Sequence, residues 1–184
     1  PAILVIGIAG YFIMNKKPKV VSVAVMYMDI IGNKEDQYLE TITEDIIFNL
    51  SKVLPGNLLV SELTAVRKLK NTDMEVGDIA KSLGVQYVFK STLQRSGGGF
   101  NLGCKLVEAK TGSETFETKV FIEENGLQSI VGVLVESIID GLDIPMAAET
   151  RKIEYDPKSY ELYLKAIDLY ARSDNIDQDL EAIK

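Results

Sequence analysis

The sequence has no histidine and no tryptophan, and Cys104 is its single cysteine. Histidine is the commonest general base at neutral pH and the commonest transition-metal ligand, so its absence disfavours both kinds of site. One thiol can form neither an internal disulfide nor a zinc site with several cysteines. We therefore predict that the chain is not an enzyme, and we assign no catalytic residue, no metal site and no cofactor.

Positive charge is also scarce, because 20 Lys and Arg residues face 27 Asp and Glu residues and leave a net charge of −7. Binding to nucleic acid needs a basic surface that displaces counterions from the phosphates. The dense basic group of this chain is limited to Lys16, Lys17 and Lys19. We expect no nucleic-acid partner.

Residues 1–14 are free of charge and have no polar face, but they are shorter than the roughly 20 residues of a membrane-spanning helix. Three interpretations are open: a truncated transmembrane helix, the apolar part of a signal peptide, or a buried core helix. We favour the first, with residues 15–19 as linker. The chain begins at Pro1 and stops inside a helical pattern at Lys184, so we interpret it as a fragment of a longer polypeptide.

Residues 20–144 show the patterns of an α/β domain. Runs of apolar or alternating residues predict strands, and apolar spacings of three and four predict helices. The expected strands cover 20–28, 58–60, 85–93, 100–107 and 116–122, and the expected helices cover 39–53, 76–83 and 127–138. This order, β-α-β-α-β-β-β-α, predicts a mixed sheet with its helices packed against it. An apolar helix precedes this domain, and a connector and a helical-repeat start follow over residues 145–184.

Local signals fix the expected ends of the helices. Thr41 with Glu44, and Thr72 with Glu75, have the spacing of a capping box at a helix N-terminus. Gly84 follows the second helix at the position where a C-terminal glycine is common.

Few residues qualify as a site. The glycines at 97–99 join two strands, so a hairpin tip is favoured over a phosphate loop. Cys104 lies in an apolar alternation and is expected to be buried. The adjacent acidic pairs 35–36, 44–45 and 123–124 point about 100° apart if helical, which favours solvated surfaces over paired-carboxylate catalysis. Asp29 follows the first strand, where open sheets place ligand contacts, and is our possible ligand contact.

Two segments carry a resemblance to a known family. Residues 84–95 resemble the pattern GVxYVLxGSVxR of TolB amino-terminal-like domains, which are relatives of FlgO and CsgG-type domains, and residues 106–112 resemble their LxDAxTG. The resemblance covers about residues 20–144, since 23–27 match IAVLPF and 38–46 match YFADGLTEDL. The chain departs from the pattern at Tyr27-Met28 (Pro-Phe in the family), at Thr41 (glycine) and at Phe116 (tryptophan).

The resemblance implies a domain without assigned chemistry. In such proteins it follows a transmembrane helix and a cytoplasmic signalling module, and tetratricopeptide repeats come after it. Residues 157–166 resemble the PxAYxLYLRG lead into a first repeat, with an insertion at 172–177 and Ala182 in the second repeat helix. One helical pair cannot bury its apolar face, so more repeats are expected.

The expected function is non-catalytic. We expect a sensing or scaffolding module of a membrane-anchored bacterial signalling protein of the cyclase, kinase or transcription-regulator type, with a protein partner bound through the repeats. The alternatives are an envelope-assembly or lipoprotein-like component of the FlgO/CsgG type, and an enzyme that uses carboxylates in a cleft at Asp29. The lysines at 16–19 favour a cytoplasmic domain by the positive-inside rule, whereas the resemblance favours the extracytoplasmic, periplasmic side, which we adopt.

Overall fold

The computed structural model describes residues 20–53, 56–144 and 156–182, and within the last helix it describes side chains up to Ser173. The predicted apolar leader and most of the connector lie outside the described residues. The elements are, in order, β1 (Val21–Val25), β2 (Asp29–Ile31), the 3-10 helix η1 (Lys34–Thr41), α2 (Ile42–Val53), β3 (Leu58–Val60), α3 (Leu63–Arg67), α4 (Val76–Leu83), β4 (Tyr87–Ser96), β5 (Gly99–Glu108), β6 (Glu114–Glu123), the 3-10 helix η2 (Glu124–Gly126), α5 (Ser129–Gly141) and α6 (Pro157–Ala182). The predicted α/β class with a mixed sheet is confirmed. Within the described part of the chain, no helix is long and apolar enough to span a membrane.

The sheet has six strands. Five of them follow the order β3-β1-β4-β5-β6, and the short β2 pairs beside β4. β1 pairs in parallel with β3 and with β4, whereas β4, β5 and β6 form an antiparallel meander. The chain therefore leaves β1 toward one neighbour through α2 and returns to the other neighbour through α3 and α4. This reversal makes the carboxyl end of β1 a topological switch point, where ligands commonly bind.

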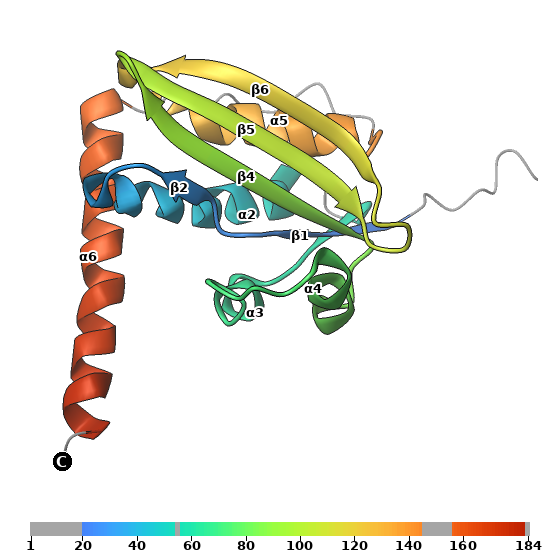
Figure 1. Ribbon diagram of the computed structural model, residues 1–184, viewed down its shortest axis with the longest axis horizontal. Helices are drawn as coiled ribbons and strands as arrows, with labels where there is room; N and C mark the ends of the chain where they lie inside the picture. Colours follow the sequence, from blue (N-terminus) through green and yellow to red (C-terminus); the bar gives the residue numbers. More distant parts are fainter. Residues whose placement is uncertain (1–19, 54–55, 145–155, 183–184) are drawn as a thin grey trace, which may run out of the picture.

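Helices cover the two faces of the sheet unequally (Figure 1). α2 and α5 lie side by side against one face, and α3 and α4 lie on the other side of β1. Val23, Ala24 and Val25 are fully buried, so β1 is covered on both faces. In β5, by contrast, Leu102 and Cys104 are buried while Asn101 between β4 and β6 is exposed. The second face of the meander is therefore open to solvent around Asn101, whereas Val88 and Val107 further along it are buried. We call the part around Asn101 the open sheet face.

The first turns of the last helix pack against the domain. Tyr160 and Leu164 are buried against the domain, and α6 contacts η1. Beyond these turns α6 runs past the rest of the domain to the C-terminal end in Figure 1. We expected an insertion at 172–177 between two repeat helices, but α6 is one continuous helix. The segment contains neither proline nor glycine, which are the residues that would interrupt it. The repeat assignment stays a prediction.

The structure also corrects local details. β2, η1 and α3 were not predicted, and both expected capping boxes are wrong. The hydroxyl of Thr41 donates to the carbonyl of Tyr38, and that of Thr72 donates to the carbonyl of Leu69. Each threonine follows a turn that is already formed, so its hydroxyl bonds backwards to a carbonyl three residues earlier instead of capping the next helix. Gly84 does end α4, in the left-handed conformation with φ 66°.

Candidate functional site

Asp29 does not lie in a crevice at the end of β1. It begins β2, where it pairs with Thr92 of β4, and its side chain is exposed. This pairing carries the chain along β4 and places Asp29 on the open sheet face. Its role as a ligand contact stays a prediction, and any ligand there would lie across strands rather than at a strand end.

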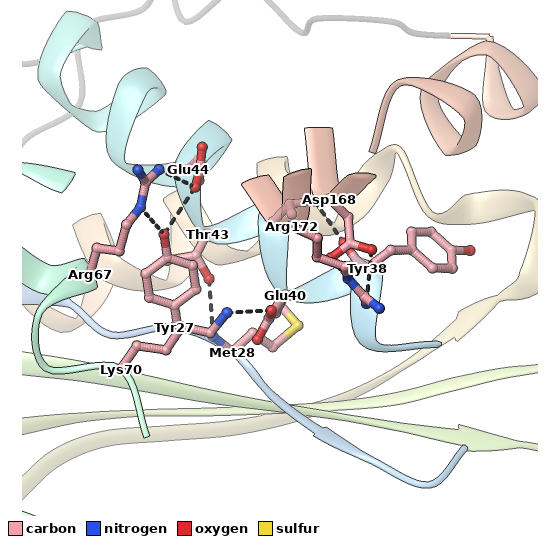
Figure 2. Close-up of polar contacts among 11 residues, drawn as sticks. Tyr27, Met28, Tyr38, Glu40, Thr43, Glu44, Arg67, Lys70, Asp168 and Arg172 are labelled. Carbon is pink, nitrogen blue, oxygen red and sulfur yellow. Dashed lines mark hydrogen bonds and ion pairs between the residues drawn. The ribbon is translucent and has the colours of Figure 1, made fainter. Parts of the chain in front are cut away.

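Tyr27 occupies the switch point instead (Figure 2). Its hydroxyl donates a hydrogen bond to Glu44 of α2 over 2.9 Å, and it accepts one from Nε of Arg67 over 3.4 Å. Arg67 also binds the same Glu44 carboxylate through Nη2 over 2.9 Å. These three side chains come from the loop after β1, from α2 and from the end of α3. They join the helices on opposite sides of the sheet.

Burial and hydrogen bonding hold Tyr27 and Arg67 of this cluster each in one protonation state at neutral pH. Burial raises the pKa of Tyr27 to about 12, with the hydrogen bond from Arg67 acting in the opposite direction. The hydrogen bonds to Tyr27 and Glu44 raise the pKa of Arg67 further above neutral pH. Tyr27 is therefore a neutral donor and Arg67 a permanent cation at physiological pH. Neither can act as a general base there.

A second ion pair extends the cluster to η1, which precedes α2. Lys70 binds Glu40 of η1, and its ammonium lies 5.0 Å from the centre of the Tyr27 ring. The backbone N–H of Met28 donates to the hydroxyl of Thr43 over 3.0 Å, which completes the connection between the loop after β1 and α2. Figure 2 shows both cations facing the carboxylates of the α2 side. Paired charges therefore surround Tyr27 at the switch point. We call Tyr27, Glu40, Glu44, Arg67 and Lys70 the switch-point clasp.

On α2, Asp45 faces away from this cluster and binds α6. It accepts hydrogen bonds from the hydroxyls of Tyr160 over 2.8 Å and Tyr163 over 3.2 Å. Burial raises the pKa of Asp45, and the bonds from the two tyrosines partly oppose that shift. Glu44 and Asp45 are neighbours in sequence, yet one contacts α3 and the other contacts α6. α2 therefore contacts both the switch point, through Glu44, and the base of α6, through Asp45.

η1 supplies a further contact to α6. The hydroxyl of Tyr38 lies 3.5 Å from Glu161, and the ammonium of Lys165 lies 5.1 Å from the Tyr38 ring centre. Burial raises the pKa of Tyr38 to about 12, so this hydroxyl is a neutral donor as well. Together with the buried Tyr160 and Leu164, these contacts define what we call the α6 junction.

Among the adjacent acidic pairs, Glu123 and Glu124 are exposed as expected, whereas the expectation is wrong for Asp36. We expected solvated surfaces, but Asp36 is buried and binds Nε and Nη2 of Arg95 with its two oxygens, over 2.9 Å and 2.7 Å. Nη1 of the same guanidinium binds Glu124 over 2.7 Å. Glu44 and Asp45 do point in different directions, as expected for adjacent residues of a helix. Each of them nevertheless binds side chains of another element rather than water alone. Sequence alone gave no sign of those partners, because they lie up to 118 positions away.

Two other candidates behave as predicted. Gly97 and Gly98 form the tip of the β4–β5 hairpin with φ 45° and 57°, as a tight turn between twisted strands requires. Cys104 is buried in β5, and burial raises the pKa of its thiol. A protonated, covered thiol is a poor nucleophile.

Comparison with known proteins gives one relative in sequence. No family model matches the chain. The chain is 25% identical over 155 residues to "Putative adenylate cyclase 3" of Rhizobium meliloti (strain 1021), a match that covers 79% of this chain. It spans only 26% of the length of that relative.

Among solved structures, the chain is similar to TolB from Acinetobacter baumannii and to lipoprotein GNA1162 from Neisseria meningitidis. The TM-score is 0.47 in both cases, with 12% and 14% identity, and each match covers 67% of this chain; it covers 28% of TolB and 96% of the lipoprotein. The C-terminal domain of LpoB from Salmonella enterica matches at a TM-score of 0.41 with 18% identity over 59% of this chain and 87% of that domain. At these scores and identities, none of their activities extends to this chain.

Proposed function

We propose that this chain is a non-catalytic scaffolding and sensing module whose α/β domain fixes the base of α6 and so presents that helix to a protein partner. The observation that carries the proposal is the α6 junction together with the apolar surface beyond it. The junction buries Tyr160 and Leu164 on one face of α6, whereas Leu162, Leu169 and Tyr170 on its other sides are exposed.

The uncovered face is apolar at regular intervals. Leu162 and Leu169 are seven residues apart and are 60% and 67% exposed, and Tyr163 and Tyr170 beside them are 46% and 70% exposed. Residues seven apart lie on one side of a helix, so Leu162 with Leu169 and Tyr163 with Tyr170 form two adjoining rows. Tyr163 also reaches Asp45 in the junction. A contiguous exposed apolar stripe on an ordered helix is typical of a surface that packs against another helix. We call these four residues the α6 stripe.

The polar contacts at the switch point support the proposal that the module is non-catalytic. The charged groups at the switch point are paired with each other, and Tyr27 is held as a neutral hydroxyl. A base or nucleophile would need a poised pKa and an open path to substrate. Tyr27 and Arg67 each keep one protonation state at neutral pH, which favours binding over catalysis.

We place the module within a membrane-anchored bacterial signalling protein, on the extracytoplasmic side. The similarity over 155 residues to the adenylate cyclase relative supports the signalling setting. The stretch that matches spans about a quarter of that relative, so the remaining three quarters have room for an output domain.

The experiment is a quantitative crosslinking pull-down from source-cell membranes with the full-length protein. We compare the wild type with the double variant Leu162→Asp/Leu169→Asp, which puts charge in the α6 stripe. The control is Leu59→Asp, at a leucine of equal exposure (58%) on the edge strand β3. The proposal expects the variant in the stripe to lose the crosslinked partner while the control keeps it.

Far-UV circular dichroism of the purified variants shows whether each one is folded. If the wild type and the folded double variant recover the partner equally, the α6 stripe is not the contact surface. Turnover of a nucleotide or other substrate by residues 20–182 alone would contradict the non-catalytic assignment.

A further inference from the structure

The open sheet face carries an ordered pattern of side chains that the α6 proposal does not use. Across the strands, Ile31, Gln94, Asn101 and Phe121 form one row, since β2 pairs with β4, β4 with β5 and β5 with β6 at these positions. The next row contains Asp29, Thr92, Gly103 and Lys119. Neighbouring strands are about 4.8 Å apart, so each row spans about 14 Å.

A hollow of about 390 Å³ lies over these rows. Gly103 forms part of its lining because it adds no side chain, and Thr92 stands so close that a Cβ at Gly103 would approach its hydroxyl to 2.9 Å. Gln94, Asn101 and Lys119 also line the hollow. Its polar lining therefore consists of two carboxamides, one hydroxyl and one ammonium.

Phe121 supplies an aromatic surface at the end of the first row. It is 54% exposed although it belongs to a strand whose next residue, Ile122, is buried. Its ring leans across β5: a Cβ at Gly99 would lie 2.7 Å from the ring atom Cζ, so only glycine leaves room for it. The ring is thus laid over the sheet beside Asn101, with one face toward solvent.

We propose that this hollow binds an uncharged oligosaccharide that lies across the strands. A carboxamide offers an acceptor oxygen and two donor hydrogens in one plane, and so can bind neighbouring sugar hydroxyls, which are both donors and acceptors. The Thr92 hydroxyl adds to this set, and the exposed Phe121 ring suits the C–H face of a pyranose ring.

The charges around the hollow argue against other classes of ligand. Lys119 is paired with Glu117 over 3.2 Å, and Asp29 at the other end of its row is negative. The row therefore has no surplus of positive charge with which to attract a phosphate or a nucleic acid. The carboxamides between Ile31 and Phe121 interrupt the apolar surface that a lipid chain would need. An uncharged polyhydroxylated ligand satisfies both conditions.

The test is isothermal titration calorimetry of the full chain with three uncharged probes: maltotriose, cellotriose and N-acetylated chitotriose. The expected result is saturable binding of at least one of them, with a Kd of about 1 mM or tighter. Asn101→Ala and Phe121→Ala should each weaken that binding about tenfold or more. The matched control is Phe48→Ala, because Phe48 is 56% exposed but lies on α2, and it should leave the affinity within about twofold.

Absence of saturable binding with all three probes overturns the proposal, as does binding that Asn101→Ala and Phe121→Ala leave unchanged. Asn101 is an exposed side chain, so its truncation tests the hollow even where loss of Phe121 disturbs β6. The outcome is independent of the α6 stripe, because the hollow is formed by β2, β4, β5 and β6.

Discussion

The hydroxyl of Tyr160 in α6 donates a hydrogen bond to the carboxylate of Asp45 in α2, across 115 positions of sequence and 2.8 Å of space. Glu44, the residue before Asp45, binds Tyr27 and Arg67 in the switch-point clasp. One turn of α2 therefore connects the carboxyl end of β1 to the base of α6.

Tyr160→Phe should loosen α6 without unfolding the α/β domain. The ring stays buried, but Asp45 loses the stronger of its two tyrosine donors, and a lost hydrogen bond to a charged group costs about 1–3 kcal/mol. We expect faster cleavage of α6 in limited proteolysis and a lower midpoint of denaturant unfolding. The matched control Tyr170→Phe changes a hydroxyl at a 70% exposed position and should leave both measurements unchanged. Identical behaviour of the two variants would mean that the bond to Asp45 does not hold α6.

The pKa of Asp45 predicts how the stability of the junction depends on pH. Burial raises this pKa above its ordinary value of 3.8, so the folded state binds the proton more tightly than the unfolded state. The resulting stabilisation is present below pH 3.8 and is lost as the pH rises through the raised pKa. The free energy of unfolding of the wild type should therefore fall over this window relative to that of Asp45→Asn, measured by denaturation at a series of pH values. A wild-type advantage that grows with pH would reverse the sign and point to the tyrosine donors as the stronger influence.

Much of the fold follows from local patterns, because apolar periodicity reports which face of an element is buried. The alternation in β5 and β6 and the spacing in α4 and α5 were sufficient to place those elements. The short β2 was missed because its three residues have no periodicity of their own, and only the pairing of Asp29 with Thr92 defines them. α3 has five residues, which is too few for a helical pattern to appear.

The polar contacts could not be predicted in the same way. Asp29 was chosen because it follows the first strand, but the chain pairs again along β4 and leaves Tyr27 at the switch point. The carboxylates of Asp36, Glu44 and Asp45 find their partners through tertiary packing, at sequence separations of 59, 23 and 115. No pattern within a single segment encodes such separations.

Leu106→Ala should destabilise the domain strongly. Leu106 is fully buried in β5, and its Cδ2 reaches to the surface of Gly141 at the end of α5. Truncation of a buried leucine costs about 2–5 kcal/mol, because contacts are lost and a cavity remains. The control is Ser113→Ala in the exposed turn before β6, which should change the free energy of unfolding by less than about 0.5 kcal/mol. Equal denaturation midpoints for the two variants would show that Leu106 does not face the core.

Cys104 should resist thiol reagents in the folded protein. It is 5% exposed, and burial raises its pKa, so both access and the thiolate fraction are low. Reaction with Ellman's reagent at pH 7.5 should be slow in buffer and complete within minutes in denaturant. Rapid reaction under native conditions would show that β5 opens locally or that Cys104 faces solvent.

Arg95→Ala should destabilise the protein more than any substitution of an exposed ion pair. Asp36 is buried and accepts two parallel hydrogen bonds from the guanidinium, so removal of Arg95 leaves an uncompensated carboxylate. A fully buried pair broken in this way costs about 3–5 kcal/mol. Arg95 is partly exposed, and we therefore expect about 2–3 kcal/mol from denaturant unfolding. Arg95→Lys keeps the charge but loses the two-pronged geometry, so it should recover only part of that loss.

The neighbouring pair gives the internal comparison. Glu124→Gln removes the second partner of the same guanidinium, but Glu124 is largely exposed, so the expected loss is about 0–1 kcal/mol and should shrink further in high salt. The loss in Arg95→Ala should persist in salt, because Asp36 is shielded from solvent. Adding Asp36→Asn to Arg95→Ala should restore part of the stability, since a neutral carboxamide costs less to bury than a lone carboxylate. If the double variant is less stable than Arg95→Ala by the full cost of Asp36→Asn alone, the two residues are energetically independent, and the pair does not hold η1 against β4.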